Sequence, residues 1–184
     1  MSHIRRLSQG IVVLVALAVG LGNSVGRKFV VVLANPAHKD STHLAQSQLP
    51  KEVQRYFEVQ RRIQVAKETK ASELDLSELS LTQIPTGIIQ LTKLQKLNLS
   101  SNQLSSLPPE ILWLTNLQSL NLSSNQLSSL PSGIGQLTKL QTLDLRGNQL
   151  SSLPPEIEKL HQSTKITVEG NPLPPHILEQ YESR

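Results

Sequence analysis

The chain has 184 residues, no cysteine, 3% aromatic residues and a formal net charge of +4. Without cysteine, a disulfide-stabilised fold, a thiol ligase and a cysteine protease are excluded. Residues 1–70 hold 11 Lys or Arg against 4 Asp or Glu, whereas residues 71–184 hold 7 against 10. The basic character therefore belongs to the N-terminal part, and we expect no nucleic-acid-binding surface on the remainder.

The chain begins with features of a targeting segment. Arg5 and Arg6 precede an apolar stretch at residues 10–22, an arrangement typical of a secretory signal peptide. We predict a signal peptide or membrane anchor over residues 1–28, and any membrane association would use residues 10–34, which include a second apolar run. We therefore expect the protein to be exported or anchored in a membrane. The alternative is a cytoplasmic protein with an apolar extension.

Residues 29–49 are predicted to form a linker, because most of them are polar and Pro36 interrupts any regular element. His38, Asp40 and His43 lie in this segment. They lack a fourth ligand and a known ligand spacing, so we expect no metal site there.

Residues 50–70 are predicted to form a helix that caps the part of the chain that follows. Apolar side chains recur every three or four residues, at Val53, Tyr56, Val59, Ile63 and Ala66. Pro50 stands near the first turn, where proline is tolerated.

Residues 71–184 repeat with a period of 23 residues, as 71–93, 94–116, 117–139, 140–162 and a partial terminal repeat 163–184. In each full repeat an L-x-L pair, such as Leu97 and Leu99, predicts a short strand, and a later Leu-Pro pair predicts a turn. We therefore predict an α/β solenoid. Its parallel strands line the concave face, and loops or short helical turns form the convex face.

One asparagine recurs at the same repeat position, where the chain leaves each strand: Asn102, Asn125, Asn148 and Asn171. In the leucine-rich repeat proteins that this pattern resembles, such asparagines turn inward, so the resemblance implies that they hydrogen-bond backbone groups that would otherwise be buried without partners.

The pattern resembles the 23-residue class of leucine-rich repeat proteins with an L-P-x-x-I outer motif. This class includes Ras-suppressor-like and plant intracellular Ras-group proteins and the repeats of Roco proteins. The resemblance covers residues 71 to about 178, and the lack of cysteine favours a bacterial or intracellular member. It implies a scaffold on which relatives bind many unrelated proteins.

A partner is expected on the outward positions of the strands. These positions are Glu73, Asp75, Lys96, Asn98, Ser119, Asn121, Thr142, Asp144, Arg146, Lys165 and Glu169. On the convex side, the repeat register predicts an exposed apolar contact at Leu112 and Trp113. The alternative for Trp113 is a ring lying flat over the neighbouring turn.

The leading functional hypothesis is a non-catalytic scaffold that binds another protein through the concave sheet. A cytoplasmic regulator or partner of a small GTPase is the alternative, and an enzyme with an unrecognised site is a weaker one. No motif in the sequence places a nucleophile beside a base, so we expect no catalytic residue, cofactor, metal or small-molecule substrate.

Overall fold

The computed structural model describes residues 12–16, 29–33, 50–161 and 163–182, and the chain divides into two compact units, 1–58 and 59–184. In the first unit, β1 (Val12–Ala16) pairs antiparallel with β2 (Phe29–Leu33). Most of the predicted signal peptide and linker, including His38, Asp40 and His43, lies outside the described residues. Within the described ranges, no helix is both long and apolar enough to cross a bilayer.

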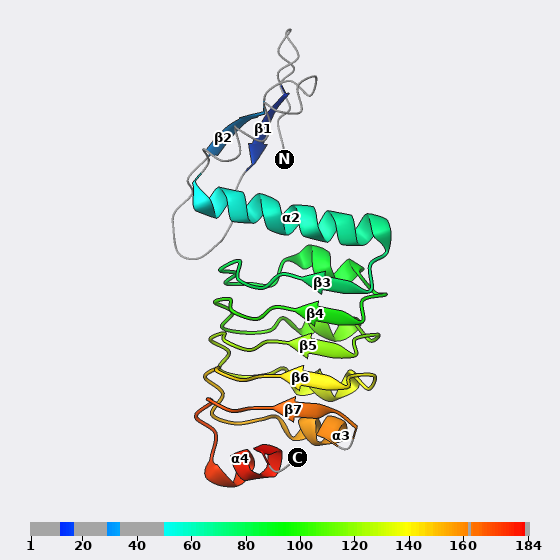
Figure 1. The fold of residues 1–184 in the computed structure, drawn as a ribbon, viewed down its shortest axis with the longest axis vertical. Helices are drawn as coiled ribbons and strands as arrows, with labels where there is room; N and C mark the ends of the chain where they lie inside the picture. Colours follow the sequence, from blue (N-terminus) through cyan, green and yellow to red (C-terminus); the bar gives the residue numbers. More distant parts are fainter. Residues whose placement is uncertain (1–11, 17–28, 34–49, 162, 183–184) are drawn as a thin grey trace. The chain divides into compact units, whose positions relative to one another are not determined.

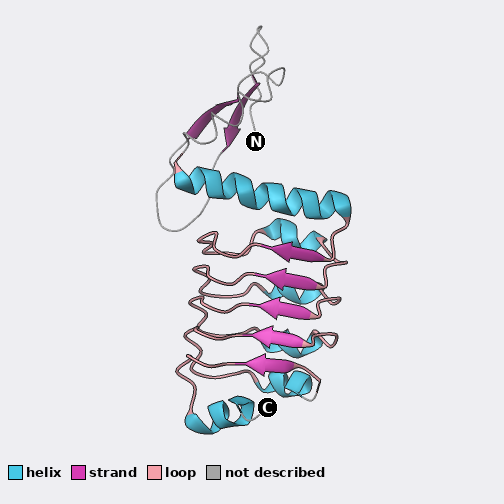
Figure 2. Cartoon of the chain, viewed as in Figure 1, coloured by secondary structure: helices cyan, strands magenta, loops and turns pink. Residues whose placement is uncertain are grey.

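The second unit is a ladder of five short parallel strands in chain order (Figures 1 and 2). The strands are β3 (Glu73–Asp75), β4 (Lys96–Asn98), β5 (Ser119–Asn121), β6 (Thr142–Asp144) and β7 (Lys165–Thr167). Each residue pairs with the residue 23 positions later, as Leu97 pairs with Leu120. This uniform register confirms the predicted solenoid. We call the outward surface of the sheet the strand face.

Short 3-10 helices form the opposite side: η1 (Thr86–Gln90), η2 (Pro109–Trp113), η3 (Ser132–Gln136) and η4 (Pro155–Ile157), the last continuing as α3 (Glu158–His161). An extended proline precedes each one, such as Pro108 with φ −68° and ψ 143°. Because proline fixes φ and donates no backbone hydrogen bond, it sets where each helix begins. These elements correspond to the predicted short helical turns.

Leucine and isoleucine side chains fill the space between the strands and the 3-10 helices. In the repeat 94–116, the side chains with at most 1% exposure are Leu94, Leu97, Leu99, Leu104, Ile111 and Leu114. Burial of one such side chain contributes about 1.5–3 kcal/mol to stability. The same positions are buried in the following repeats, so one continuous core runs along the array.

The helix α2 (Lys51–Thr69) covers the first layer of the array through Val59, Ile63 and Ala66, which are buried. The Nη1 atom of Arg62 donates a hydrogen bond of 2.9 Å to the carbonyl oxygen of Asp75. The prediction that Tyr56 belongs to the packed face is wrong, since Tyr56 is 38% exposed. Its ring instead meets Phe57 edge-on, with the ring centroids 5.9 Å apart.

The last layer is covered by α4 (Pro175–Glu182), a helix that the repeat pattern does not predict. Tyr181 is buried, and Ile177 and Leu178 are half-buried against the same core. Both ends of the array therefore carry a helix, which keeps the edge layers of leucine out of water.

Candidate functional site

The recurring asparagines fix the loops that leave the strands. The Nδ2 group of Asn125 donates hydrogen bonds to the carbonyl oxygens of Leu99 and Leu122, at 2.9 and 3.0 Å, and its Oδ1 accepts one from the N–H of Leu104 at 3.0 Å. Asn102, Asn148 and Asn171 are buried and bonded in the same way. These asparagines are bonded inward and take no part in the outer surface.

A second recurring position has a positive φ and comes just before each asparagine, or before Leu79 in the first repeat. It is occupied by Glu78, Ser101, Ser124, Gly147 and Gly170, with φ between 55° and 73°. Left-handed backbone is strained for side chains other than glycine. The chain therefore turns out of every strand at the same place, which keeps the strands and their outward residues aligned.

The uniform register places the outward side chains in three rows across the strand face. The first row contains Glu73, Lys96, Ser119, Thr142 and Lys165, and the second contains Asp75, Asn98, Asn121, Asp144 and Thr167. The third row, just beyond the strand ends, contains Ser77, Ser100, Ser123, Arg146 and Glu169. All these side chains are exposed or half-buried, so the structure brings the predicted binding residues together on one surface.

Neighbours in the first row pair with one another. Lys96 forms an ion pair with Glu73 at 2.7 Å, and the hydroxyl of Thr142 donates to the Ser119 hydroxyl at 2.8 Å. The side chain of Lys165, at the end of the row, has no hydrogen-bond or ion-pair partner among the described residues. Within that part of the chain its ammonium group is available to a ligand.

Asp144 and Arg146 form a compact charged pair beside Lys165. The Arg146 Nε atom lies 2.9 Å from Asp144 Oδ1, and the Thr167 hydroxyl donates to the same oxygen at 3.2 Å. Burial raises the pKa of Asp144, but hydrogen bonds from Arg146 and its positive charge outweigh burial, so the pKa lies below the usual 3.8. The Asp144 carboxylate correspondingly raises the pKa of Arg146. Both groups therefore stay charged near neutral pH.

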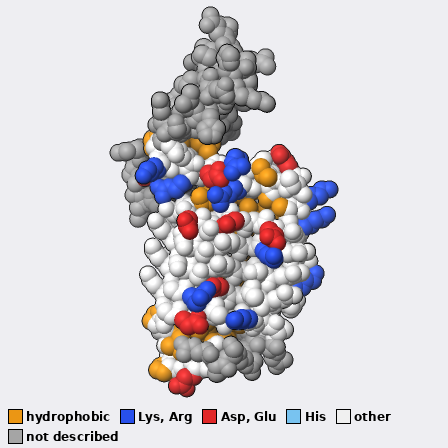
Figure 3. Space-filling view, viewed as in Figure 1, with side chains coloured by type: hydrophobic (Ala, Val, Ile, Leu, Met, Phe, Trp, Pro, Cys, Tyr) orange, Lys and Arg blue, Asp and Glu red, His pale blue; other side chains and the backbone are white. Residues whose placement is uncertain are grey.

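The strand face is hollowed over β5, β6 and β7, with a volume of about 300 Å³. The lining includes Ser119, Asn121, Thr142, Asp144, Arg146, Lys165 and Thr167. In Figure 3 the middle of this face is free of charged side chains, and charges gather toward its ends. Within the described part of the chain, no group of three His, Asp or Glu side chains is placed to hold a metal ion. Leu120 and Leu143 also line the hollow, so it offers apolar surface as well as hydrogen-bonding groups.

Comparison with known proteins agrees with this geometry. A leucine-rich repeat family model matches residues 69–127, and a model of two leucine-rich repeats matches residues 115–161. The repeat region belongs to the leucine-rich repeat family. A search of curated proteins found no significant match.

Two solved structures of leucine-rich repeat proteins are similar to this chain. One, from Leptospira interrogans, has 38% sequence identity and a TM-score of 0.51, covering 60% of this chain and 34% of that protein. The other, a Shigella effector domain, has 25% identity and a TM-score of 0.51, covering 70% of this chain and 53% of that domain. The present chain thus spans about a third and about half of their lengths.

On the helical side of the leucine-rich repeats, Trp113 is 60% exposed and Leu112 is half-buried. Their repeat counterparts in η3 are Gly135 and Gln136. Leu112 lies over Gly133, where a Cβ atom would come within 2.5 Å of Leu112 Cδ1. The predicted exposed apolar contact is therefore an exposed indole beside a leucine that packs onto the next repeat.

Two lysines that were not predicted as part of a site lie in the turns that follow η1 and η3. Lys93 and Lys139 occupy one repeat position, 46 residues apart, and both are exposed. The signal was present in the repeat alignment, where the intervening residue is Asn116. Alternation along the strands, from which most of the binding residues were predicted, carries no information about these turn positions.

Proposed function

We propose that this protein is a non-catalytic scaffold that captures another protein on its strand face. Leucine-rich repeat folds are typically interaction modules without catalysis, which supports the proposal. The observation that carries it is the hollow over β5 to β7, which polar and charged side chains line together with Leu120 and Leu143, and where the Lys165 side chain is unpaired among the described residues. These outward groups are not needed to hold the core, so they are available for recognition.

Affinity capture with crosslinking from the host cell, followed by mass spectrometry, tests this proposal. Thr142→Arg fills the hollow, and Lys165→Glu reverses the charge of the lysine in it. Each variant should reduce capture of the partner at least fivefold. The matched controls Gln126→Arg and Lys159→Glu make the same changes at exposed positions away from the hollow. If the controls reduce capture as much as the hollow variants, the strand face is not the binding surface.

The same capture experiment separates the proposed scaffold from a regulator of a small GTPase. Recovery of a GTPase that is lost in the hollow variants would support the regulatory role. Recovery of other proteins only, with GDP or GTP present, would exclude that role while leaving the scaffold proposal intact.

We further propose that residues 1–28 act as a signal peptide or membrane anchor, on the strength of the basic and apolar pattern in residues 5–22. Intact mass and cell fractionation of a C-terminally tagged protein test this. Loss of about 26 residues or more indicates export, and full-length protein in the membrane fraction indicates an anchor. Full-length protein in the cytoplasmic fraction contradicts both.

A further inference from the structure

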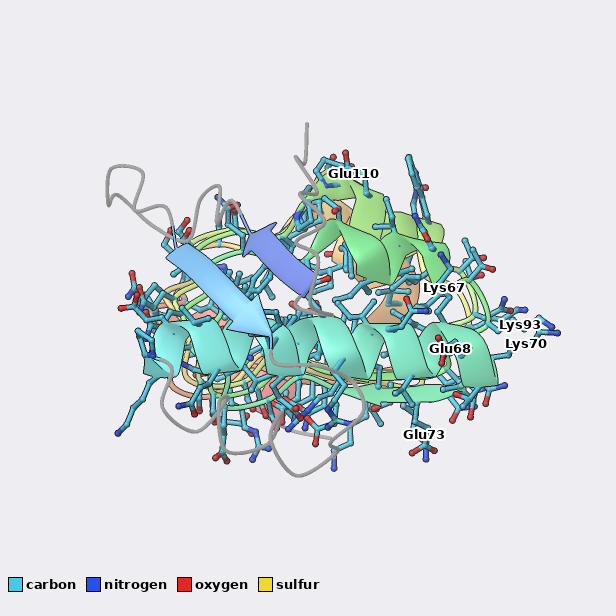
Figure 4. All side chains as sticks on the ribbon, turned by 90° about the horizontal axis from the view of Figure 1, so that it is seen from above. Lys67, Glu68, Lys70, Glu73, Lys93 and Glu110 are labelled. Atoms are coloured by element: carbon cyan, nitrogen blue, oxygen red, sulfur yellow. The ribbon has the colours of Figure 1, made fainter. Side chains whose placement is uncertain are left out.

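A second surface lies away from the strand face, at the edge where the 3-10 helices turn back toward the strands. We call it the lysine edge and define it as Lys67, Lys70, Lys93 and Lys139 together with Trp113. All five side chains are exposed. Figure 4 shows Lys67, Lys70 and Lys93 at one end of α2, with Glu73 and Glu110 set apart on either side.

Two lysines of this edge donate hydrogen bonds to amide side chains of the repeats. Lys67 Nζ donates to Gln90 Oε1 at 2.9 Å, and Gln90 occupies the repeat position of Trp113 in the layer above. Lys139 Nζ donates to Asn116 Oδ1 at 2.7 Å, and Asn116 lies three residues after Trp113. Lys67 is thus bonded to the repeat equivalent of Trp113 in the layer above, and Lys139 to a residue one turn after Trp113.

Asn116 also forms a hydrogen bond to the backbone beside Lys93. Its Nδ2 group donates to the carbonyl oxygen of Thr92 at 2.8 Å, next to Lys93 in sequence. The four lysines and the acidic neighbours Glu68 and Glu110 give this edge a net charge of +2, whereas residues 59–184 hold 11 Lys or Arg against 11 Asp or Glu. The edge is therefore a local excess of positive charge in a unit with no net charge.

We propose that the lysine edge docks on an anionic lipid bilayer, with Trp113 seated among the lipid headgroups. Tryptophan favours the boundary between water and hydrocarbon, and lysines near a membrane are attracted to anionic lipids. The edge carries lysines and no arginine, whereas interfaces between proteins are enriched in arginine and depleted in lysine. This composition favours a bilayer over a protein partner.

Trp113 is the only tryptophan in the chain, so its fluorescence reports on this surface directly. The full-length protein is mixed with vesicles of phosphatidylcholine containing about a third phosphatidylglycerol, and with vesicles of phosphatidylcholine alone. With anionic vesicles at low salt, Trp113 emission should move to shorter wavelength and acrylamide quenching should fall. High salt should reverse both effects, because it screens the lysines.

The variant pair Lys93→Gln with Lys139→Gln should weaken binding to anionic vesicles about 30-fold, at roughly fivefold for each lysine near the surface. The control pair Lys96→Gln with Lys165→Gln changes the net charge equally, but on the strand face. It should leave the Trp113 response unchanged. An equal loss in both pairs would show a general charge effect and overturn the proposal.

Two other outcomes would also overturn it. If the protein sediments with both kinds of vesicle while Trp113 emission stays constant, the lysine edge is not the membrane contact. If vesicles have no effect but a polyglutamate peptide shifts the emission, the edge binds an acidic protein. Neither result depends on whether the strand face captures a partner, so this inference and the proposed function fail separately.

Discussion

Leu112 occupies the space that a side chain at position 133 would need, since a Cβ atom on Gly133 would lie 2.5 Å from Leu112 Cδ1. Two residues later, a Cβ atom on Gly135 would collide with the backbone carbonyl oxygen of Glu156. The two glycines lie on the same 3-10 helix, but their obstacles differ. One is the end of a flexible side chain, and the other is backbone of the next repeat.

We expect Gly133→Ala and Gly135→Ala to differ in cost. Leu112 can rotate away from a methyl group at 133, so that variant should lose about 1 kcal/mol or less, whereas Gly135→Ala should lose about 3 kcal/mol. Urea unfolding monitored by circular dichroism measures both. In Leu112→Ala, the cost of Gly133→Ala should vanish while that of Gly135→Ala persists. Equal costs at the two glycines would refute this explanation.

Replacing a ladder asparagine should be among the most damaging single changes. Asn125→Ala leaves the N–H of Leu104 and the carbonyl oxygens of Leu99 and Leu122 without their side-chain partner, so we expect a loss of about 3 kcal/mol or more. The exposed neighbour Gln126 provides the control, and Gln126→Ala should change the unfolding free energy by less than about 0.5 kcal/mol. A similar small effect of Asn125→Ala would disprove the structural role of the ladder.

The recurring position with positive φ allows the cost of left-handed backbone to be tested in both directions. Ser124 has φ 55° and its counterpart Gly147 has φ 62°, with no atom closer than 3.7 Å to a Cβ at 147. Ser124→Gly should stabilise the protein by about 0.5–1 kcal/mol, and Gly147→Ser should destabilise it by a similar amount. Thermal unfolding of the two variants measures both stability changes. Ser128→Gly, at an exposed position that is not left-handed, should not stabilise.

Acid should weaken the fold through Asp144. Because its pKa in the folded protein lies below 3.8, the stabilisation from its bonds to Arg146 is fully present above that pH. It is lost as pH falls through the folded pKa. The stability difference between the wild type and Asp144→Asn should therefore be constant from about pH 5 to 7 and shrink below about pH 4. A difference that is independent of pH down to pH 2.5 would contradict the assignment.

The buried face of the cap helix should contribute most of the stability of its attachment, since the bonds from Arg62 and Lys67 to the repeats are exposed. Ile63 is 6% exposed, and its Cγ2 lies 3.1 Å from where a Cβ on Gly87 would stand. Ile63→Ala should cost about 2–4 kcal/mol, while Val65→Ala, at a side chain 45% exposed, should cost less than about 0.5 kcal/mol. Hydrogen exchange should show the loss concentrated in η1 and β3. Similar costs for the two variants would indicate that α2 does not depend on this packing.

Much of the array could be predicted because each repeat states the same pattern. Leu97, Leu120 and Leu143 recur at 23-residue intervals, and the strands pair in that register. The helix α4 could not be read in this way, since Pro175 to Glu182 depart from the repeat and are ordered by contact with the last layer. Tyr56 was wrongly assigned to the packed face of α2, because the spacing of apolar residues along a helix does not show how far the surface under the helix extends.

The candidate site was predictable in position but not in detail. Alternation along the strands identified Thr142, Asp144 and Lys165 as outward residues. It gave no sign that Thr142 pairs with Ser119 while Lys165 is left unpaired among the described residues, because side-chain pairing across strands depends on distances. The lysine edge escaped notice for a similar reason. Its members come from the C-terminal end of α2 and the residue after it, from η2, and from the turns that follow η1 and η3, and only folding brings them together.

The identical register of all five strands also bears on how such a chain can change in length. Duplication or deletion of a segment of 23 residues anywhere between the two end helices would join ends that already have the same geometry, adding or removing one rung without new packing. A segment of another length would break the asparagine ladder at the junction. Unequal crossover within the gene would therefore yield foldable descendants in steps of one repeat, each with a longer or shorter recognition surface.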